Sequence, residues 1–415
     1  MPIRPHHHLH LLPLLTFLLL TLSNPPSALA DCECGYIAST TNRSAHPTLL
    51  FTDLLETDFT RLAPGAGADN SHHPPYDEDG IWTRGHTGWA RQAFNVSRER
   101  ARGEYGEVFD VGNVRVVEGG EGVGLELVVR SGVVDGMVAG AELDTERLDL
   151  RWGTFRAVMK VSRVRGTCAA FFWYFNDTQE IDMEFLSQDF NPSNGSYPVN
   201  LVLQSREAAL AGYDAAQTGN FVRTDLPFDP TTSFHEYRID YLPGRVFFYA
   251  DGALLAAMDG PAVPSSPGHL ILQHWSNGNP RWSGGPPAED AALVVRSVKA
   301  YFNSSLGQRQ RDWENRCRDP AAPGAVCVIP DVTPGELGAA DWFFSDQGNM
   351  TNNQTTTTFE QSEGSRLKQL WWLTVGWLLL GAKSNTRGAI CSDHPIHSAS
   401  RKQTGKDDGY EQRRH

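Results

Sequence analysis

The chain has 415 residues and a formal net charge of −13, from 36 Lys and Arg against 49 Asp and Glu, so it lacks the overall basic surface that nucleic acid phosphates require. Hydrophobic residues make up 40% and aromatic residues 10%, which excludes a compositionally disordered chain and allows a sizeable core. The 39 glycines and 25 prolines favour many turns between short strands and argue against an all-helical bundle.

The first 30 residues have the layout of a secretory signal. A short start with one arginine and several histidines precedes an apolar stretch at 11–22, and Ala28-Leu29-Ala30 follows it as a cleavage site with small residues at its first and third positions. A transmembrane helix is the alternative, but the apolar stretch is shorter than the roughly 20 residues that a bilayer requires. The sequence therefore predicts a signal peptide at 1–30, a mature chain that begins near Asp31, and a secreted, cell-surface or cell-wall location.

Glycosylation acceptors and cysteines agree with an oxidising compartment. Seven Asn-x-Ser/Thr triplets are present, at Asn42, Asn95, Asn176, Asn194, Asn303, Asn349 and Asn353. The six cysteines are Cys32, Cys34, Cys168, Cys317, Cys327 and Cys391. Most of them are expected to pair, and no metal-binding spacing occurs among them. Cys32 and Cys34 are expected to bond elsewhere rather than to each other, whereas a bond between Cys317 and Cys327 would close a loop; the sequence does not fix the pairing.

The C-terminal third divides into a linker, an apolar segment and a tail. Residues 311–369 are predicted to be a linker that contains cysteines and an Asn/Thr-rich stretch. Residues 370–382 read LWWLTVGWLLLGA, which is short for a spanning helix. The 383–415 tail is polar and has seven Lys and Arg, so a membrane anchor with a cytoplasmic tail is one interpretation, and an interfacial or disordered tail is the other. A lipid-anchor signal is not favoured, because it would end in its apolar stretch.

Between these ends, residues 31–310 have the periodicity of strands. Apolar and polar residues alternate along several short runs, with turn residues between them and no convincing helical stripe. In chain order, the predicted strands lie at 125–130, 153–161, 168–175, 180–185, 235–258 (three strands joined by tight turns), 270–275 and 293–302. The predicted fold is all-β, a sandwich of two antiparallel sheets.

Three acids at 180–184 carry the chemistry. On a strand, Glu180, Asp182 and Glu184 share one face, while Ile181 and Met183 take the other. Repulsion within such a row makes at least one carboxyl group hold its proton more tightly, and glycoside hydrolysis needs one ionised carboxylate and one protonated acid. The outer two Cα atoms are about 13 Å apart along a strand, so side-chain convergence and strand curvature must bring the carboxyl groups to the spacing of about 5 Å that retention requires. A solvated strand face is the alternative.

Aromatic residues precede the acids. The strand at 168–175 and the turn at 176–178 place the acids on the second strand of a hairpin, beside Trp173 and Tyr174. Sugar rings stack on such side chains, and ordinary core packing is the alternative. Because the two residues are adjacent, only one of them faces the acids.

Five segments carry a recognisable pattern: EIDMEF at 180–185, GTFRAVMK at 153–160, FHEYRIDY at 234–241, FFYADG at 247–252 and HWSNGNPRW at 274–282. Together they resemble glycoside hydrolase family 16, which contains laminarin and lichenan hydrolases and transglycosylases with a concanavalin A-like β-jelly roll. The resemblance spans most of 80–303. The CECGY start at 32–36 is similar to the secreted fungal branch.

The resemblance implies roles for the acids. Glu180 would be the nucleophile, Glu184 the general acid/base, and Asp182 the auxiliary acid that tunes the pair. The compact five-residue form is similar to the lichenase and transglycosylase branches rather than to the typical laminarinases. Arg156 and Val158 stand where lichenase-like members have an acid and a basic group, so the lichenase subsites do not carry over.

The resemblance also suggests substrate contacts. Trp275 and Trp282 are similar to aromatic sugar platforms, and Gln273 stands where some members place a polar contact. Loop packing is the alternative for each of these residues. His235 is a further candidate, although a histidine at a strand start is more commonly a structural donor.

Three functions compete. The first is a secreted retaining endo-type hydrolase of β-1,3 or mixed β-1,3/1,4-glucan, the second a cell-wall transglycosylase that uses the same residues, and the third a non-catalytic lectin-like or wall-structural protein. The expected partner is a polysaccharide, and no cofactor, metal ion or nucleic acid is expected. A monomer is expected, with possible membrane anchoring through 370–382.

Overall fold

The computed structural model describes residues 31–38, 49–61, 88–117, 124–333, 337–347 and 354. The predicted signal peptide at 1–30, the apolar segment at 370–382 and the tail at 383–415 lie outside the described residues. Within the described part of the chain, none of the helices has both the length and the apolar character needed to cross a membrane.

Two large sheets dominate the described residues. The first has eight strands, in the order β17-β16-β15-β10-β19-β8-β7 with β3 beside β19. Its strands are β3 Asp53–Asp58, β7 Val114–Val117, β8 Gly124–Val129, β10 Leu150–Lys160, β15 His235–Leu242, β16 Arg245–Ala250, β17 Ala253–Asp259 and β19 Ala291–Ser304. Each pair in this sheet is antiparallel.

The second large sheet has nine strands among the described residues, in the order β14-β13-β12-β11-β18-β9-β6-β5 with β4 beside β9. Its strands are β4 Trp89–Arg91, β5 Phe94–Val96, β6 Gly106–Phe109, β9 Met137–Thr145, β11 Cys168–Asn176, β12 Gln179–Leu186, β13 Pro198–Ser205, β14 Phe221–Asp225 and β18 His269–Trp275. The pairing of β6 with β9 is parallel, and the other pairs are antiparallel.

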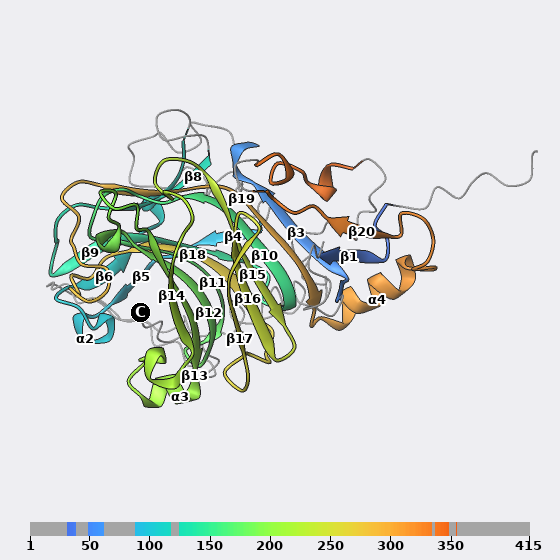
Figure 1. Cartoon of the computed structure of the whole chain (residues 1–415), viewed down its shortest axis with the longest axis horizontal. Helices are drawn as coiled ribbons and strands as arrows, with labels where there is room; N and C mark the ends of the chain where they lie inside the picture. Colours follow the sequence, from blue (N-terminus) through green and yellow to red (C-terminus); the bar gives the residue numbers. More distant parts are fainter. Residues whose placement is uncertain are drawn as a thin grey trace, which may run out of the picture.

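Short helices join the strands. They are η1 Phe59–Arg61, α2 Arg98–Ala101, η2 Val111–Asn113, η3 Ser187–Asp189, α3 Arg206–Leu210, η4 Ala215–Thr218, α4 Gly307–Arg316, η5 Leu337–Ala339 and η6 Phe344–Asp346. Figure 1 shows α2 and α3 beside the nine-stranded sheet, and α4 with β1 at the opposite end of the molecule.

The main core fills the space between the two sheets. Alternate residues of β12, including Ile181 and Met183, are fully buried in it, as are Phe155 and Met159 of β10. The period-two alternation places these apolar side chains on one face of each strand. The predicted sandwich of two antiparallel sheets is therefore confirmed, and so are the hairpin that carries the acids and the three consecutive strands at 235–258.

A third, three-stranded sheet joins the two ends of the described chain. It consists of β2 Leu50–Phe51, β1 Gly35–Ala38 and β20 Val326–Ile329, and β1 is parallel to β20. Figure 1 shows β1, β20 and α4 on the far side of the eight-stranded sheet from α2 and α3. Residues 311–333 and 337–347, predicted to be part of a linker, instead form helix and strand and pack onto the sandwich.

Two disulfides fix this junction. Cys32 bonds Cys327 and Cys34 bonds Cys317, across 295 and 283 residues of sequence. The expectation that Cys32 and Cys34 bond elsewhere is confirmed. The suggested Cys317–Cys327 bond is wrong, because each of these two cysteines is bonded to a cysteine near Asp31 instead. Cys168 is buried and free.

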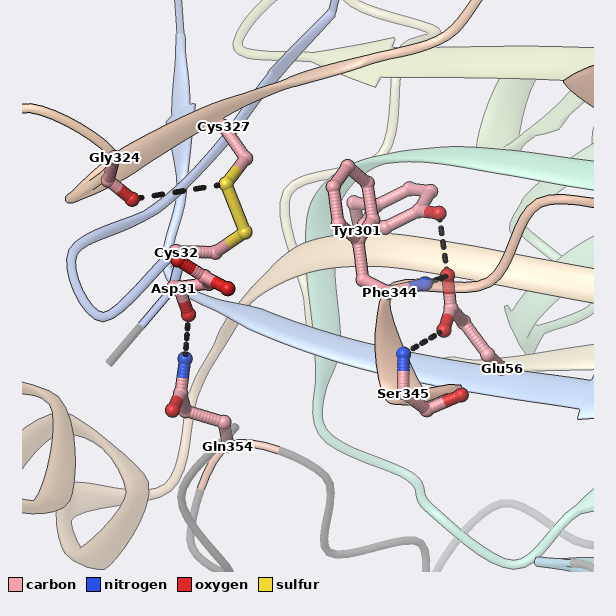
Figure 2. Close-up of a disulfide and its surroundings, with 9 residues drawn as sticks. All are labelled: Asp31, Cys32, Glu56, Tyr301, Gly324, Cys327, Phe344, Ser345 and Gln354. Atoms are coloured by element: carbon pink, nitrogen blue, oxygen red, sulfur yellow. Dashed lines mark hydrogen bonds between the residues drawn. A yellow bond between two sulfur atoms is a disulfide. The ribbon is translucent and has the colours of Figure 1, made fainter. Parts of the chain in front are cut away.

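Figure 2 shows the first disulfide beside a buried carboxylate that anchors the C-terminal segment. Glu56 of β3 accepts hydrogen bonds from the Tyr301 hydroxyl at 2.6 Å, from the Phe344 N–H at 3.2 Å and from the Ser345 N–H at 2.8 Å. The Gln354 side chain donates to the Asp31 carbonyl at 3.0 Å. The described part of the C-terminal segment thus packs on the eight-stranded sheet and does not cover the outer face of the nine-stranded sheet, where the acids of β12 lie.

Candidate active site

The three acids of β12 lie on the outer face of the nine-stranded sheet. Their neighbours Ile181, Met183 and Phe185 enter the core, so the acids point away from the eight-stranded sheet. In register, Glu184 is opposite Ala170 of β11, Asp182 is opposite Phe172, and Glu180 is opposite Tyr174. Each acid is only 3% exposed. This face is therefore a floor of small and aromatic residues with a carboxyl row along one strand.

A pocket of about 400 Å³ opens beside this row. Asp182 and Glu184 contribute to its wall. The other lining residues are Arg102, Val202, Gln204, Gly212, Tyr213, Asp214, Ala215, Ala216, Phe221, Asn279, Arg281 and Trp282. The pocket is thus bounded by the end of α2, by the α3–η4 segment and by the loop after β18.

The Glu184 carboxyl group receives two hydrogen bonds on one oxygen. The Trp282 indole N–H donates to Oε1 at 3.2 Å, and the Cys168 thiol donates to the same atom at 3.8 Å. Burial raises the pKa of Glu184 to about 7, while the two donors and the charge of Arg102 lower it. A carboxyl group with a pKa near neutrality serves both as proton donor and as proton acceptor.

Asp182 also holds its proton more strongly than a free aspartic acid does. Burial, then the charges of Glu180 and Glu184, and then a hydrogen bond with Glu180 raise its pKa well above the usual range. A protonated Asp182 donates to Glu180, which favours the ionised form of Glu180. The row therefore contains the unequal carboxyl groups that attack on a sugar and proton donation to its leaving group require.

A second group of acids lies on the same face. Glu142 and Asp144 of β9 are in register with Gln273 and Ile271 of β18 and are buried. The Gln273 amide donates to Glu142 Oε2. Asp144 approaches the His269 ring at 3.7 Å. From β12 to β9 the floor is three strand spacings, or about 14 Å, across.

Glu107 of β6 extends this second group. Burial raises its pKa to about 8, the Asn277 amide lowers it, and the nearby Glu142 carboxylate raises it further. Glu107 is therefore neutral at pH 7. None of these acids was predicted, although Glu142-Leu143-Asp144 repeats on β9 the alternation of the β12 acids.

The two adjacent aromatic residues take opposite faces, as expected for a strand. Tyr174 lies on the face of the acids, where its hydroxyl donates to Asp177 at 2.9 Å and its ring meets the His269 ring edge-on. Trp173 lies in the core, fully buried, and its indole N–H donates to the Leu150 carbonyl at 3.0 Å. Trp173 is therefore placed away from any substrate, because its strand position turns it inward.

The other candidate substrate contacts differ in how far they are exposed. Trp282 is partly exposed and lines the pocket. Trp275 is fully buried with Cys168 and Leu186, so it offers no sugar platform. Gln273 is on the face of the acids but 1% exposed, and it binds Glu142.

His235 lies on the other sheet. Its Nδ1 is 2.7 Å from Asp251, its Nε2 is 2.8 Å from the Ser233 hydroxyl, and its ring stacks on Phe228 at 3.5 Å. This histidine holds the start of β15 and has no place in the pocket. Arg156, also on the eight-stranded sheet, donates to the Pro330 carbonyl under the C-terminal segment.

The carboxyl row, its unequal pKa values and its pocket agree with the domain that the sequence matches. Residues 107–291 match the family model of glycosyl hydrolases family 16. The family 16 match includes β12 with its three acids and extends from β6 to the start of β19.

Individual relatives cover less of the chain. A beta-glucanase of Paenibacillus polymyxa is 29% identical over 139 residues, which is 32% of this chain and 52% of that protein. Congo red hypersensitive protein 1 of Saccharomyces cerevisiae is 25% identical over 184 residues, which is 40% of this chain and 34% of that protein. The chain thus spans about half, or less, of the length of these relatives.

Among solved structures, the beta-glucanase of Bacillus licheniformis is similar over 60% of this chain and 97% of that chain, with a TM-score of 0.43 and 17% identity.

Within the described residues, no group of three or more His, Cys, Asp or Glu side chains is arranged to hold a metal ion.

Proposed function

We propose that this chain is a retaining glycosidase that acts on β-linked glucan of cell walls by double displacement. The single observation that carries the proposal is the row Glu180, Asp182 and Glu184 beside a pocket, with Asp182 protonated and Glu184 poised near neutrality. The family 16 match and the beta-glucanase relatives support β-glucan as the substrate class.

In the proposed mechanism, Glu180 attacks the anomeric carbon while Glu184 donates its proton to the leaving oxygen. A glycosyl ester on Glu180 results, and Glu184 is left as a carboxylate. Glu184 then removes a proton from the incoming water or sugar hydroxyl, which attacks the ester and restores Glu180. Asp182 remains protonated and holds the Glu180 carboxylate in place through their hydrogen bond.

A transglycosylase is the second candidate. The wall of the pocket beside Glu184 is formed by loops from both sides of the sheet, which provides contacts for an incoming sugar as well as for water. For either reaction, we propose that the substrate is a glucan with β-1,3 or mixed β-1,3/1,4 linkages.

The experiment is incubation of the purified protein with laminarin or lichenan in the presence and absence of a labelled oligosaccharide acceptor. Short unlabelled products indicate hydrolysis, and labelled products longer than the acceptor indicate transfer. Tight glucan binding without either product would contradict the enzyme proposal and favour a lectin-like protein.

We also propose that the protein is secreted and glycosylated, with membrane anchoring through 370–382 as the alternative to free release. The signal-like sequence at 1–30 supports secretion, as do two disulfides and two acceptors, Asn95 and Asn194, that are exposed. The similarity to Congo red hypersensitive protein 1 of Saccharomyces cerevisiae and to Crh-like protein 2 of Botryotinia fuckeliana supports a place in the fungal branch of family 16. Fractionation with a carbonate wash distinguishes release from anchoring.

The acidity of Glu184 predicts the alkaline limb of the pH profile. Because Glu184 must be protonated to assist the leaving group, kcat/KM is expected to fall about tenfold per pH unit above its pKa of about 7. Trp282→Phe removes a donor that favours the carboxylate, so the pKa rises and the limb is expected to move up by about one pH unit. Initial rates on a soluble glucan between pH 4 and 9 measure this limb, and a limb that stays in place would contradict the assignment.

A further inference from the structure

Two loops from opposite edges of the nine-stranded sheet meet above the pocket. Helix α2 connects β5 to β6 at one edge, and the α3–η4 segment connects β13 to β14 at the other edge. Arg102, which ends α2, donates through Nη1 to the Gly212 carbonyl at 2.9 Å, and its Cζ lies 5.2 Å from the centre of the Tyr213 ring. All three residues line the pocket together with Glu184. We call this bridge of Arg102, Gly212 and Tyr213 the strap.

The backbone on both sides of the strap is held in an uncommon conformation. Arg102 has φ 54° and Tyr213 has φ 66°, which is the left-handed region that residues other than glycine rarely adopt. The Arg102 carbonyl accepts from the Asn279 amide at 3.2 Å, and the Tyr213 N–H donates to the Ala208 carbonyl at 2.7 Å. Such conformations persist where the surroundings impose them and are concentrated at ligand clamps and switch regions. The backbone therefore holds Arg102 and Tyr213 in contact without a bound substrate.

We propose that the strap determines which part of a glucan reaches the acids. With the strap closed, chain ends and short oligosaccharides enter along the pocket, whereas an internal segment of a polymer reaches Glu184 only after Arg102 separates from Gly212 and Tyr213. This inference rests on the β-glucan activity proposed above.

The contacts are weak enough to open. Arg102 is exposed and Tyr213 is half-buried, so the stacking and the hydrogen bond each shift an equilibrium only a few-fold. Two few-fold effects multiply to about tenfold, which corresponds to a closed strap in roughly nine of ten molecules. A ligand that binds only the open form then associates about ten times more slowly than it does with a permanently open cleft.

The test compares Arg102→Met and Tyr213→Leu with Arg281→Met. Arg281 also lines the pocket and is exposed, but it makes no contact across the strap. Arg281→Met therefore removes one positive charge from the pocket and leaves the strap intact. For each protein, kcat/KM is measured on polymeric glucan and on a short oligosaccharide of the same linkage. We expect the polymer-to-oligosaccharide ratio to rise about tenfold in Arg102→Met, which loses both contacts, and a few-fold in Tyr213→Leu, which keeps the hydrogen bond to Gly212. The ratio of the control is expected to stay within about twofold of wild type.

Two further measurements separate the strap from electrostatics. Loss of the Arg102 charge raises the pKa of Glu184 and moves the alkaline limb upward, whereas Tyr213→Leu leaves that charge in place. A shared rise in the ratio despite different pH limbs is therefore due to the strap. In a Glu180→Gln background, tryptophan fluorescence follows the association of polymeric glucan. The association rate is expected to rise about tenfold when Arg102→Met removes both strap contacts.

The outcomes distinguish the two proposals. A wild-type protein that neither binds nor turns over glucan would overturn the proposed function and this inference with it. A wild-type protein that turns over glucan, with both substrates changed by the same factor in the strap variants, would overturn the strap alone.

Discussion

Replacing Glu180 by Gln is expected to lower the turnover of β-glucan by about 10⁴-fold or more, because an amide cannot form the glycosyl ester on which double displacement depends. The substitution conserves shape on a buried strand face, so glucan binding is expected to survive. Release of reducing ends measures turnover, and isothermal titration with an oligosaccharide measures binding.

Glu107→Gln is the matched control for this prediction. Glu107 is also buried on the nine-stranded sheet, and its pKa of about 8 makes it neutral at pH 7, so the amide removes no charge. We expect its kcat to stay within a few-fold of wild type. Turnover by Glu180→Gln within tenfold of wild type would show that the nucleophile lies elsewhere.

The strand pattern predicted the acid row because a period of two is enforced by the backbone. Once Ile181, Met183 and Phe185 are assigned to the core, the acids between them must take the other face. The same argument applies to Glu142 and Asp144 on β9, which were overlooked because two acids form a shorter signal than three.

Aromatic residues were harder to place, because a tryptophan that stacks on sugar and one that fills a core have the same sequence signal. Trp173 and Trp275 are fully buried, whereas Trp282 is partly exposed. Trp282 differs in belonging to the loop after β18 rather than to a strand, and loops carry binding residues on a rigid scaffold.

Long-range partners left no local signal. Cys32 and Cys34 find partners across 295 and 283 residues, and Arg102 meets Tyr213 only because loops from the two edges of one sheet converge. The contact of Arg102 with Tyr213 depends on strand order, because β5 and β14 lie at opposite ends of the nine-stranded sheet. A single sequence gives the strands but not their order.

A Glu184 variant tests both steps of the proposed mechanism. Glu184→Ala removes both the acid of the first step and the base of the second, and hydrolysis of natural glucan is expected to fall about 10²- to 10⁴-fold. A substrate with an activated leaving group needs no proton for the first step, so its glycosyl ester on Glu180 should still form and accumulate.

Azide then provides the decisive measurement. Azide needs no base, so it should attack the accumulated ester and restore turnover of the activated substrate, with a glycosyl azide of retained configuration as the product. Glu180→Gln forms no ester and should give no such product, which makes it the control. In Glu184→Ala, the alkaline limb near pH 7 should also vanish, because the group that titrates there is gone. An unchanged limb, or a rate that azide leaves unaltered, would assign the proton transfer to a different carboxyl group on this face, of which Glu142 lies in the same row across the sheet.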